Sequence, residues 1–184
     1  MPMTESISIA RRPRTRVAVF ACVVIVAVAI DQLTKFWALH ALSDGRTVPV
    51  LGSLLRFTLV FNPGASLGFG SSQTWIISVF AIVACIALAV LVWRTRSMWW
   101  TVFLSLAFAG ALGNLIDRCM YAQGFLNGKV VDFLNYGWSV GNVADIELMV
   151  AGIGIVAMIL FGVPFDEPHR KADHSHQSKE AGAR

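Results

Sequence analysis

The chain has 184 residues, of which 56% are hydrophobic and 14% are charged, and its formal net charge is +4. This length suits a single domain. So high an apolar fraction excludes an ordinary soluble domain and indicates an integral membrane protein. The basic residues lie in short clusters outside the apolar runs, which argues against nucleic-acid binding and is typical of membrane topology signals.

The chain begins with a basic segment, residues 1–16, that precedes the first apolar run. The run contains Ala27-Val28-Ala29, a pattern that also fits a cleaved secretory signal peptide. We favour an uncleaved helix, because the apolar pattern continues to Phe36 and Trp37. A lipobox at Cys22 is disfavoured, because too few apolar residues precede it.

Apolar segments of sufficient length predict membrane-spanning helices, since a bilayer core of about 30 Å requires ~20 helical residues. The predicted spans are residues 17–38, 73–93, 98–120 and 143–165. Basic clusters flank alternate ends of these spans, which predicts that both termini are cytoplasmic and that the loops 39–72 and 121–142 lie outside.

The predicted fold class is an all-α membrane protein, with four transmembrane helices and a small extracytoplasmic β-rich segment. The β-rich segment is predicted from the run Leu55–Phe61, in which apolar and β-branched residues dominate. Residues 17–165 form the membrane domain in this prediction. The polar residues 166–184 are predicted to be a disordered cytoplasmic tail.

Four aspartates are predicted to lie at one level of the membrane. With a rise of about 1.5 Å per residue, Asp31 lies ~21 Å into the first span, and Asp117 and Asp145 lie ~28 Å and ~30 Å above the inner ends of theirs. Asp132 falls in the outer loop. Charged groups at the edge of the hydrocarbon cost several kcal/mol unless they are paired or hydrated, so this convergence marks a candidate functional site.

The polar residues of the first and third spans share helix faces. Asp31 and Lys35 are four residues apart, which favours a structural ion pair. Asn114, Asp117 and Arg118 also share one face, after glycines that permit close packing. The simplest interpretation is a polar clamp between helices, so that these residues position others rather than react.

The remaining polar motifs lie around the fourth span. Asn142 and Asp145 are spaced as a helix N-cap and a carboxylate stabilised by the helix dipole. Asp132 lies between β-branched and aromatic residues, where desolvation raises the pKa of a carboxyl group. Two acids in one partly dry site can divide the roles of base and acid. The spacing alone leaves open whether Asp132 and Asp145 meet. Asn62 begins a predicted turn, from which it could donate a hydrogen bond to a substrate backbone.

Other chemistries find little support. The cysteines, Cys22, Cys85 and Cys119, are predicted to be small packed residues, because they show no metal-ligand spacing. The histidines of the tail are predicted to be solvated. The sequence contains no nucleophile elbow, zinc-protease motif or phosphate loop. We therefore predict neither a metal nor a cofactor.

Five of these motifs occur in an order that resembles the lipoprotein signal peptidases (signal peptidase II). They are distributed over residues 17–165, and together they make the resemblance specific. The motifs are Asp31-Gln32-Leu33-Thr34-Lys35, Phe61-Asn62-Pro63-Gly64-Ala65-Ser66, Gly113-Asn114-Leu115-Ile116-Asp117-Arg118, Val130-Val131-Asp132-Phe133 and Asn142-Val143-Ala144-Asp145.

The resemblance implies an aspartic endopeptidase of the bacterial inner membrane that cleaves signal peptides from diacylglyceryl-modified prolipoproteins, just before the lipidated cysteine. It implies that Asp132 and Asp145 form the catalytic pair, near the outer face. It also implies site-shaping or substrate-binding roles for Asp31, Lys35, Asn62, Asn114, Asp117, Arg118 and Asn142. The expected partners are the prolipoprotein substrates and membrane lipids, the expected inhibitor is globomycin, and the expected state is a monomer.

The chain departs from the family pattern at two places. Ser66-Leu67 stands where a small residue and an aromatic residue are common, and Gly141 stands where phenylalanine is common. We expect both departures to alter the pocket wall and the substrate preference more than the two acids.

Competing functions are less consistent with the sequence. A small transporter or proton-coupled channel would need a carboxylate relay that crosses the membrane, whereas these acids cluster at one side. A presenilin-like protease would need a Gly-x-Gly-Asp motif, which is absent from the sequence. A purely structural subunit would not need five polar motifs at one level.

Overall fold

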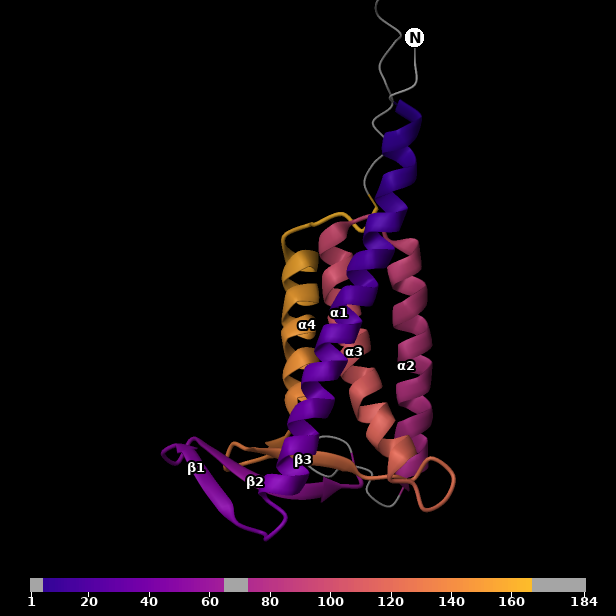
Figure 1. Ribbon diagram of the computed structural model, residues 1–184. Coiled ribbons are helices and arrows are strands. Elements are labelled where there is room, and N and C mark those ends of the chain that lie inside the picture. Colours follow the sequence, from indigo (N-terminus) through magenta and orange to yellow (C-terminus); the bar gives the residue numbers. More distant parts are fainter. Residues whose placement is uncertain (1–4, 65–72, 167–184) are drawn as a thin grey trace, which may run out of the picture.

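A computed structural model describes residues 5–64 and 73–166. Within these ranges, four helices are long and apolar enough to cross a membrane, and a small antiparallel sheet lies at one end of their bundle (Figure 1). The helices are α1 (Glu5–Ala41), α2 (Thr74–Arg94), α3 (Met98–Met120) and α4 (Val143–Leu160). The strands are β1 (Thr47–Leu51), β2 (Leu55–Asn62), β3 (Val130–Asn135) and β4 (Val140–Gly141). The predicted fold class is confirmed.

The end of α4 differs from the predicted span, which ran to residue 165. Gly162 adopts a positive φ of 65°. The backbone N–H of Gly162 donates to the carbonyl of Ile159, and the N–H of Val163 donates to that of Met158. This pair of bonds is the Schellman motif, in which a glycine ends a helix without steric penalty. The prediction was wrong here because hydropathy alone does not register a glycine stop.

Helix α3 lies at the centre of the bundle and packs against α1, α2 and α4. Gly110 permits a close approach to α4, because a Cβ atom there would lie 2.6 Å from the carbonyl oxygen of Ala144. Gly113 does the same toward α1, where a Cβ would lie 2.5 Å from Asp31 Oδ2. The predicted role of these glycines in helix packing is therefore confirmed.

The sheet has the strand order β1-β2-β3-β4, and every neighbouring pair is antiparallel. The strand predicted at Leu55–Phe61 is confirmed as β2. Asp132, which was predicted to lie in an outer loop, instead lies in β3, and that prediction was wrong. Strand β3 is buried because Phe133 and Leu134 pack against Ala38 and Leu42 at the end of α1.

The other end of the bundle joins the α2–α3 connection to the segment after α4. Thr95 Oγ1 donates to the carbonyl oxygen of Phe165 at 2.7 Å, and the backbone N–H of Arg96 donates to the same oxygen at 3.2 Å. The basic first part of α1 lies at this end too (Figure 1). The predicted tail beyond residue 166 and the departures at Ser66 and Leu67 lie outside the described residues.

Candidate active site

A buried ionic cluster joins α1 to α3 near the sheet. Lys35 Nζ lies 2.9 Å from Asp31 Oδ2 and 2.9 Å from Asp117 Oδ2, and it donates to Asn114 Oδ1 at 3.1 Å. The side chains of the two aspartates and the lysine are at most 3% exposed. The ion pair predicted from the spacing of Asp31 and Lys35 is present, and Asp117 enlarges it. Removal of one partner from such a buried cluster costs about 3–5 kcal/mol, because it leaves a charge uncompensated.

The same cluster fixes the backbone on either side of it. Asp31 Oδ1 accepts a hydrogen bond from the backbone N–H of Ala144 at 3.0 Å, and Asp117 Oδ2 accepts one from the backbone N–H of Val131 at 3.0 Å. Ala144 lies in the first turn of α4, where N–H groups have no partner within the helix. The cluster therefore holds the start of α4 and strand β3 against α1 and α3.

Asn142 and Asp145 form a capping box at the start of α4. The Asn142 side-chain oxygen accepts from the backbone N–H of Asp145 at 3.1 Å, and Asp145 Oδ2 accepts from the backbone N–H of Asn142 at 3.0 Å. Asn114 Nδ2 donates to the other carboxylate oxygen of Asp145 at 3.1 Å. The predicted cap is thus present, and it fixes the orientation of the Asp145 carboxylate.

Asp132 is held by two asparagine amides. Asn142 Nδ2 donates to its Oδ1 at 2.6 Å, and Asn62 Nδ2 donates to its Oδ2 at 2.9 Å. The side chain is 2% exposed, and this burial raises the pKa of Asp132 to about 6 against the opposing effect of the Asn62 hydrogen bond. The negative charge of Asp145 raises the pKa further. Asn142 thus contacts both carboxylates, so Asp132 and Asp145 lie in one site.

Arg118 organises the backbone that surrounds this site. Its Nη2 donates to the carbonyl of Gly64 at 2.6 Å, and its Nη1 lies 3.4 Å from the carbonyls of Pro63 and Gly128. Pro63 and Gly64 directly follow Asn62, and Gly128 lies two residues before the start of β3. The guanidinium therefore joins the two chain segments that carry Asn62 and Asp132.

Two polar residues of the spans were missed by the sequence analysis. Gln32 Nε2 lies within 3.2 Å of Asp31 Oδ2, Asp117 Oδ1 and the carbonyl of Gly113, so it bridges the ionic cluster. Glu147 on α4 is 8% exposed, and its Oε2 has no hydrogen-bond partner among the described residues. An amide or carboxylate within an apolar helix was itself the signal that could have identified both.

Gly141 has a closer relation to the acids than we predicted. A Cβ atom at this position would lie 2.7 Å from Asp145 Oδ2, and its three nearest atoms all belong to Asp145. This contact does not test the expectation that the departure affects the pocket wall more than the acids, which stays a prediction. The backbone φ of Gly141 is not in the left-handed region, so it is the space for the carboxylate that requires glycine here.

The environments of the two acids differ. Asp132 is buried, whereas Asp145 is exposed. An acid that retains a proton beside one that is open to water can protonate a leaving group while the other activates water. Among the described residues, no group of three His, Cys, Asp or Glu side chains is placed to hold a metal ion.

Known proteins resemble this chain in sequence and in fold. Residues 23–161 match a peptidase family, A8, described as signal peptidase (SPase) II. The chain is 66% identical over 170 residues to a lipoprotein signal peptidase of Bifidobacterium longum subsp. infantis. This match covers 91% of the chain and 93% of the relative. The chain is 38% identical to one of Mycobacterium avium, over 89% of this chain and 92% of the relative. A solved bacterial membrane enzyme shares the fold with a TM-score of 0.69 and 30% identity, over 77% of this chain and 87% of the other. The chain belongs to the signal peptidase II family.

Proposed function

We propose that the chain is a membrane aspartic endopeptidase that removes signal peptides from diacylglyceryl prolipoproteins, with Asp132 and Asp145 as its catalytic pair. The family supports the reaction. The observation that carries the assignment of the pair is that Asn142 hydrogen-bonds to both carboxylates. Asp31, Lys35 and Asp117 form the ionic cluster behind the pair and serve to position it.

In the proposed mechanism, Asp145 is the base, because it is exposed to the water that it deprotonates. It takes a proton from water as the water oxygen bonds to the scissile carbonyl carbon. Asp132 supplies a proton to the amide nitrogen as the C–N bond breaks, and a bound substrate favours its protonated form by excluding water. The products are the carboxyl group of the signal peptide and the amine of the lipidated cysteine.

The bonds to the carboxylates assign roles to the asparagines. Asn62 and Asn142 hold Asp132, and Asn114 holds Asp145. Asn114 also accepts hydrogen bonds from Lys35 and Asn142, so it connects the ionic cluster to the pair. We therefore assign the three asparagines to positioning, and we assign Arg118 to the support of the backbone around them.

The proposed location is the bacterial inner membrane, with the sheet and the catalytic pair at the outer face. The lipid and signal helix of a prolipoprotein already lie in the bilayer, so its scissile bond is presented near the interface where water is available. This orientation accounts for a peptidase site at the end of the bundle rather than at its centre.

The test is cleavage of a lipidated prolipoprotein by purified variants in detergent. Asp132→Asn and Asp145→Asn should each abolish turnover while both proteins still bind globomycin, since an amide retains the shape of the carboxylate but cannot exchange a proton. Asp44→Asn, which changes an exposed acid after α1, is the control and should cleave normally. Cleavage at the wild-type rate by either dyad variant would remove that residue from the pair.

A further inference from the structure

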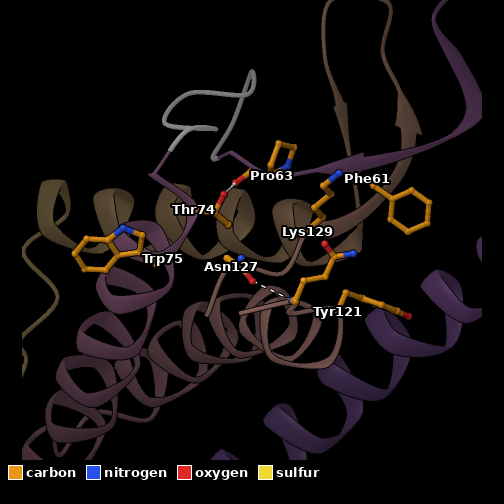
Figure 2. Close-up of a pocket in the computed structure, with 8 residues that line it drawn as sticks. Phe61, Pro63, Thr74, Trp75, Tyr121, Asn127 and Lys129 are labelled. Carbon is orange, nitrogen blue, oxygen red and sulfur yellow. Dashed lines mark hydrogen bonds between the residues drawn. The ribbon is translucent and has the colours of Figure 1, made fainter. Parts of the chain in front are cut away.

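A cavity of about 580 Å³ lies at the sheet end of the bundle, between the start of α2, the end of α3 and the end of β2. Figure 2 shows Trp75, Tyr121, Asn127 and Lys129 around it. Neither aspartate of the proposed catalytic pair lines this cavity. The cavity is thus separate from the pair. It lies close to the membrane interface, because α2 begins there and α3 ends there.

This cavity lies on the other side of the sheet from the catalytic pair. Successive side chains of a strand point to opposite faces. On β2, Asn62 reaches Asp132, so the preceding Phe61 points to the opposite face, where it lines the cavity. A ligand in this cavity would therefore be separated from the two carboxylates by the strand.

The cavity is lined by one cation and by several side-chain amides and hydroxyls. Lys129 is the one charged residue among those that line it, and its ammonium makes no ion pair with the described part of the chain. Asn127 Oδ1 accepts hydrogen bonds from the backbone N–H groups of Gln123 and Gly124, at 3.0 Å and 2.8 Å, which leaves its amide nitrogen as a donor. An exposed ammonium in a cavity that also contains an amide N–H donor suits a phosphate group.

A second, more apolar cavity of about 470 Å³ adjoins the first at Tyr121, the one described residue that lines both. It lies between α1 and α3 and extends along α1 from Leu39 to Ala29, a rise of about 15 Å. Leu33 and Phe36, which line it, are 67% and 61% exposed on a membrane-spanning helix, so it opens to the bilayer. Its length and lining suit an acyl chain.

We propose that an anionic phospholipid of the outer leaflet binds across the two cavities, with its phosphate at Lys129 and one acyl chain in the groove between α1 and α3. The cavity with the lysine at the interface and the apolar groove inside the bilayer match the two parts of such a lipid in order and in depth. The groove also borders Gln32, Lys35 and Asp117, so a bound chain would contact the ionic cluster that supports the catalytic pair. The lipid is therefore expected to stabilise the folded protein.

The proposal is tested with the purified full-length protein in detergent, titrated with dioleoyl phosphatidylglycerol. Native mass spectrometry measures binding, and the melting temperature measures stabilisation. Dioleoyl phosphatidylcholine, which has the same chains but no net charge, should bind more weakly. Lys129→Gln should weaken binding of the anionic lipid about fivefold, the effect of one basic residue near an anionic surface. Arg56→Gln, which removes an exposed cation from β2, should bind as the wild type does.

A third variant tests the groove. Ala29→Phe fills the inner end of the apolar cavity and should reduce the affinity for both lipids, whereas Lys129→Gln should reduce only that for the anionic lipid. Equal affinity of Lys129→Gln and the wild type for the anionic lipid would overturn the proposal. An equal rise in melting temperature with inorganic phosphate alone would show an anion site without a lipid. Displacement of the lipid by an equimolar prolipoprotein signal peptide would assign the groove to substrate instead.

Discussion

Asp132 combines burial with hydrogen bonds that have opposite effects on its pKa. Asn62 and Asn142 donate to its two oxygens, and these bonds favour the ionised form. Burial nevertheless raises the pKa of Asp132 from 3.8 to about 6. The folded protein therefore binds this proton more tightly than the unfolded chain does, and stability must fall as the pH rises through this range.

Asp132→Asn should remove that pH dependence. Relative to the wild type, the melting temperature of the variant should increase as the pH rises from about 4 to about 6, and the difference should remain constant above that range. The amide also places one N–H group against an asparagine donor, which adds an offset of about 1–3 kcal/mol that does not change with pH. Melting curves in detergent at several pH values check this, with Asp44→Asn as the exposed control. Parallel curves for Asp132→Asn and the wild type would contradict it.

Gly141 provides the space in which the Asp145 carboxylate forms its capping box. Gly141→Ala should force that carboxylate to rotate, because the new methyl group would lie 2.7 Å from Oδ2. A side chain can rotate with little effect on the fold, so we expect a small loss of stability, about 1 kcal/mol for the cap, but about a tenfold loss of turnover and a displaced pH–rate profile. Gly152→Ala is the matched control, since a Cβ there meets nothing within 4 Å. Equal pH–rate profiles for the two variants would remove Gly141 from the positioning of Asp145.

Among the elements, the helices were more predictable than the sheet. Long apolar runs are sufficient to predict spans, and a β-branched run predicted β2. Strand β1 contains Pro49, a residue with low strand propensity, and β4 has only two residues. Both are stabilised by pairing with neighbouring strands rather than by their own propensity. The same limit applies to the site: helical spacing indicated the faces of Asp31 and Asp117, but only the packed fold brings Asn62 to Asp132.

Arg118 joins the segment after β2 to the segment before β3, so its loss should loosen both. Lysine has a single ammonium and cannot reach three carbonyls with the fixed fork of a guanidinium. Arg118→Lys should lower the melting temperature and reduce turnover on the order of a hundredfold, with residual cleavage, because the acids remain present but are displaced by about 1 Å. Arg56→Lys, the same substitution at an exposed position, is the control. If Arg118→Lys melts as the wild type does and loses all turnover, Arg118 acts on the substrate rather than on the fold.

At the scale of the whole molecule, the basic residues outside the spans concentrate at one end of the bundle. The end that joins Thr95 and Arg96 to Phe165 carries Arg94 and Arg96, and the basic first part of α1 lies at the same end (Figure 1). The loops at the sheet end, residues 42–73 and 121–142, contain three basic residues in total. Short loops rich in arginine and lysine are retained in the cytoplasm.

Because the sheet and the basic residues lie at opposite ends of the bundle, one label at each end is sufficient to test the orientation in the membrane. Ser53→Cys, in the turn between β1 and β2, should react with a membrane-impermeant maleimide in intact spheroplasts, because the sheet lies outside in the proposed orientation. Asp166→Cys, after α4, should react only after the membrane is opened. Both variants require a background in which Cys22, Cys85 and Cys119 are replaced, since Cys22 and Cys119 are exposed. Labelling of residue 166 in sealed spheroplasts would place the catalytic pair on the cytoplasmic side. A prolipoprotein whose lipidated cysteine lies at the outer face could not then reach Asp132 and Asp145, so this result would overturn the proposed orientation and the route of the substrate together.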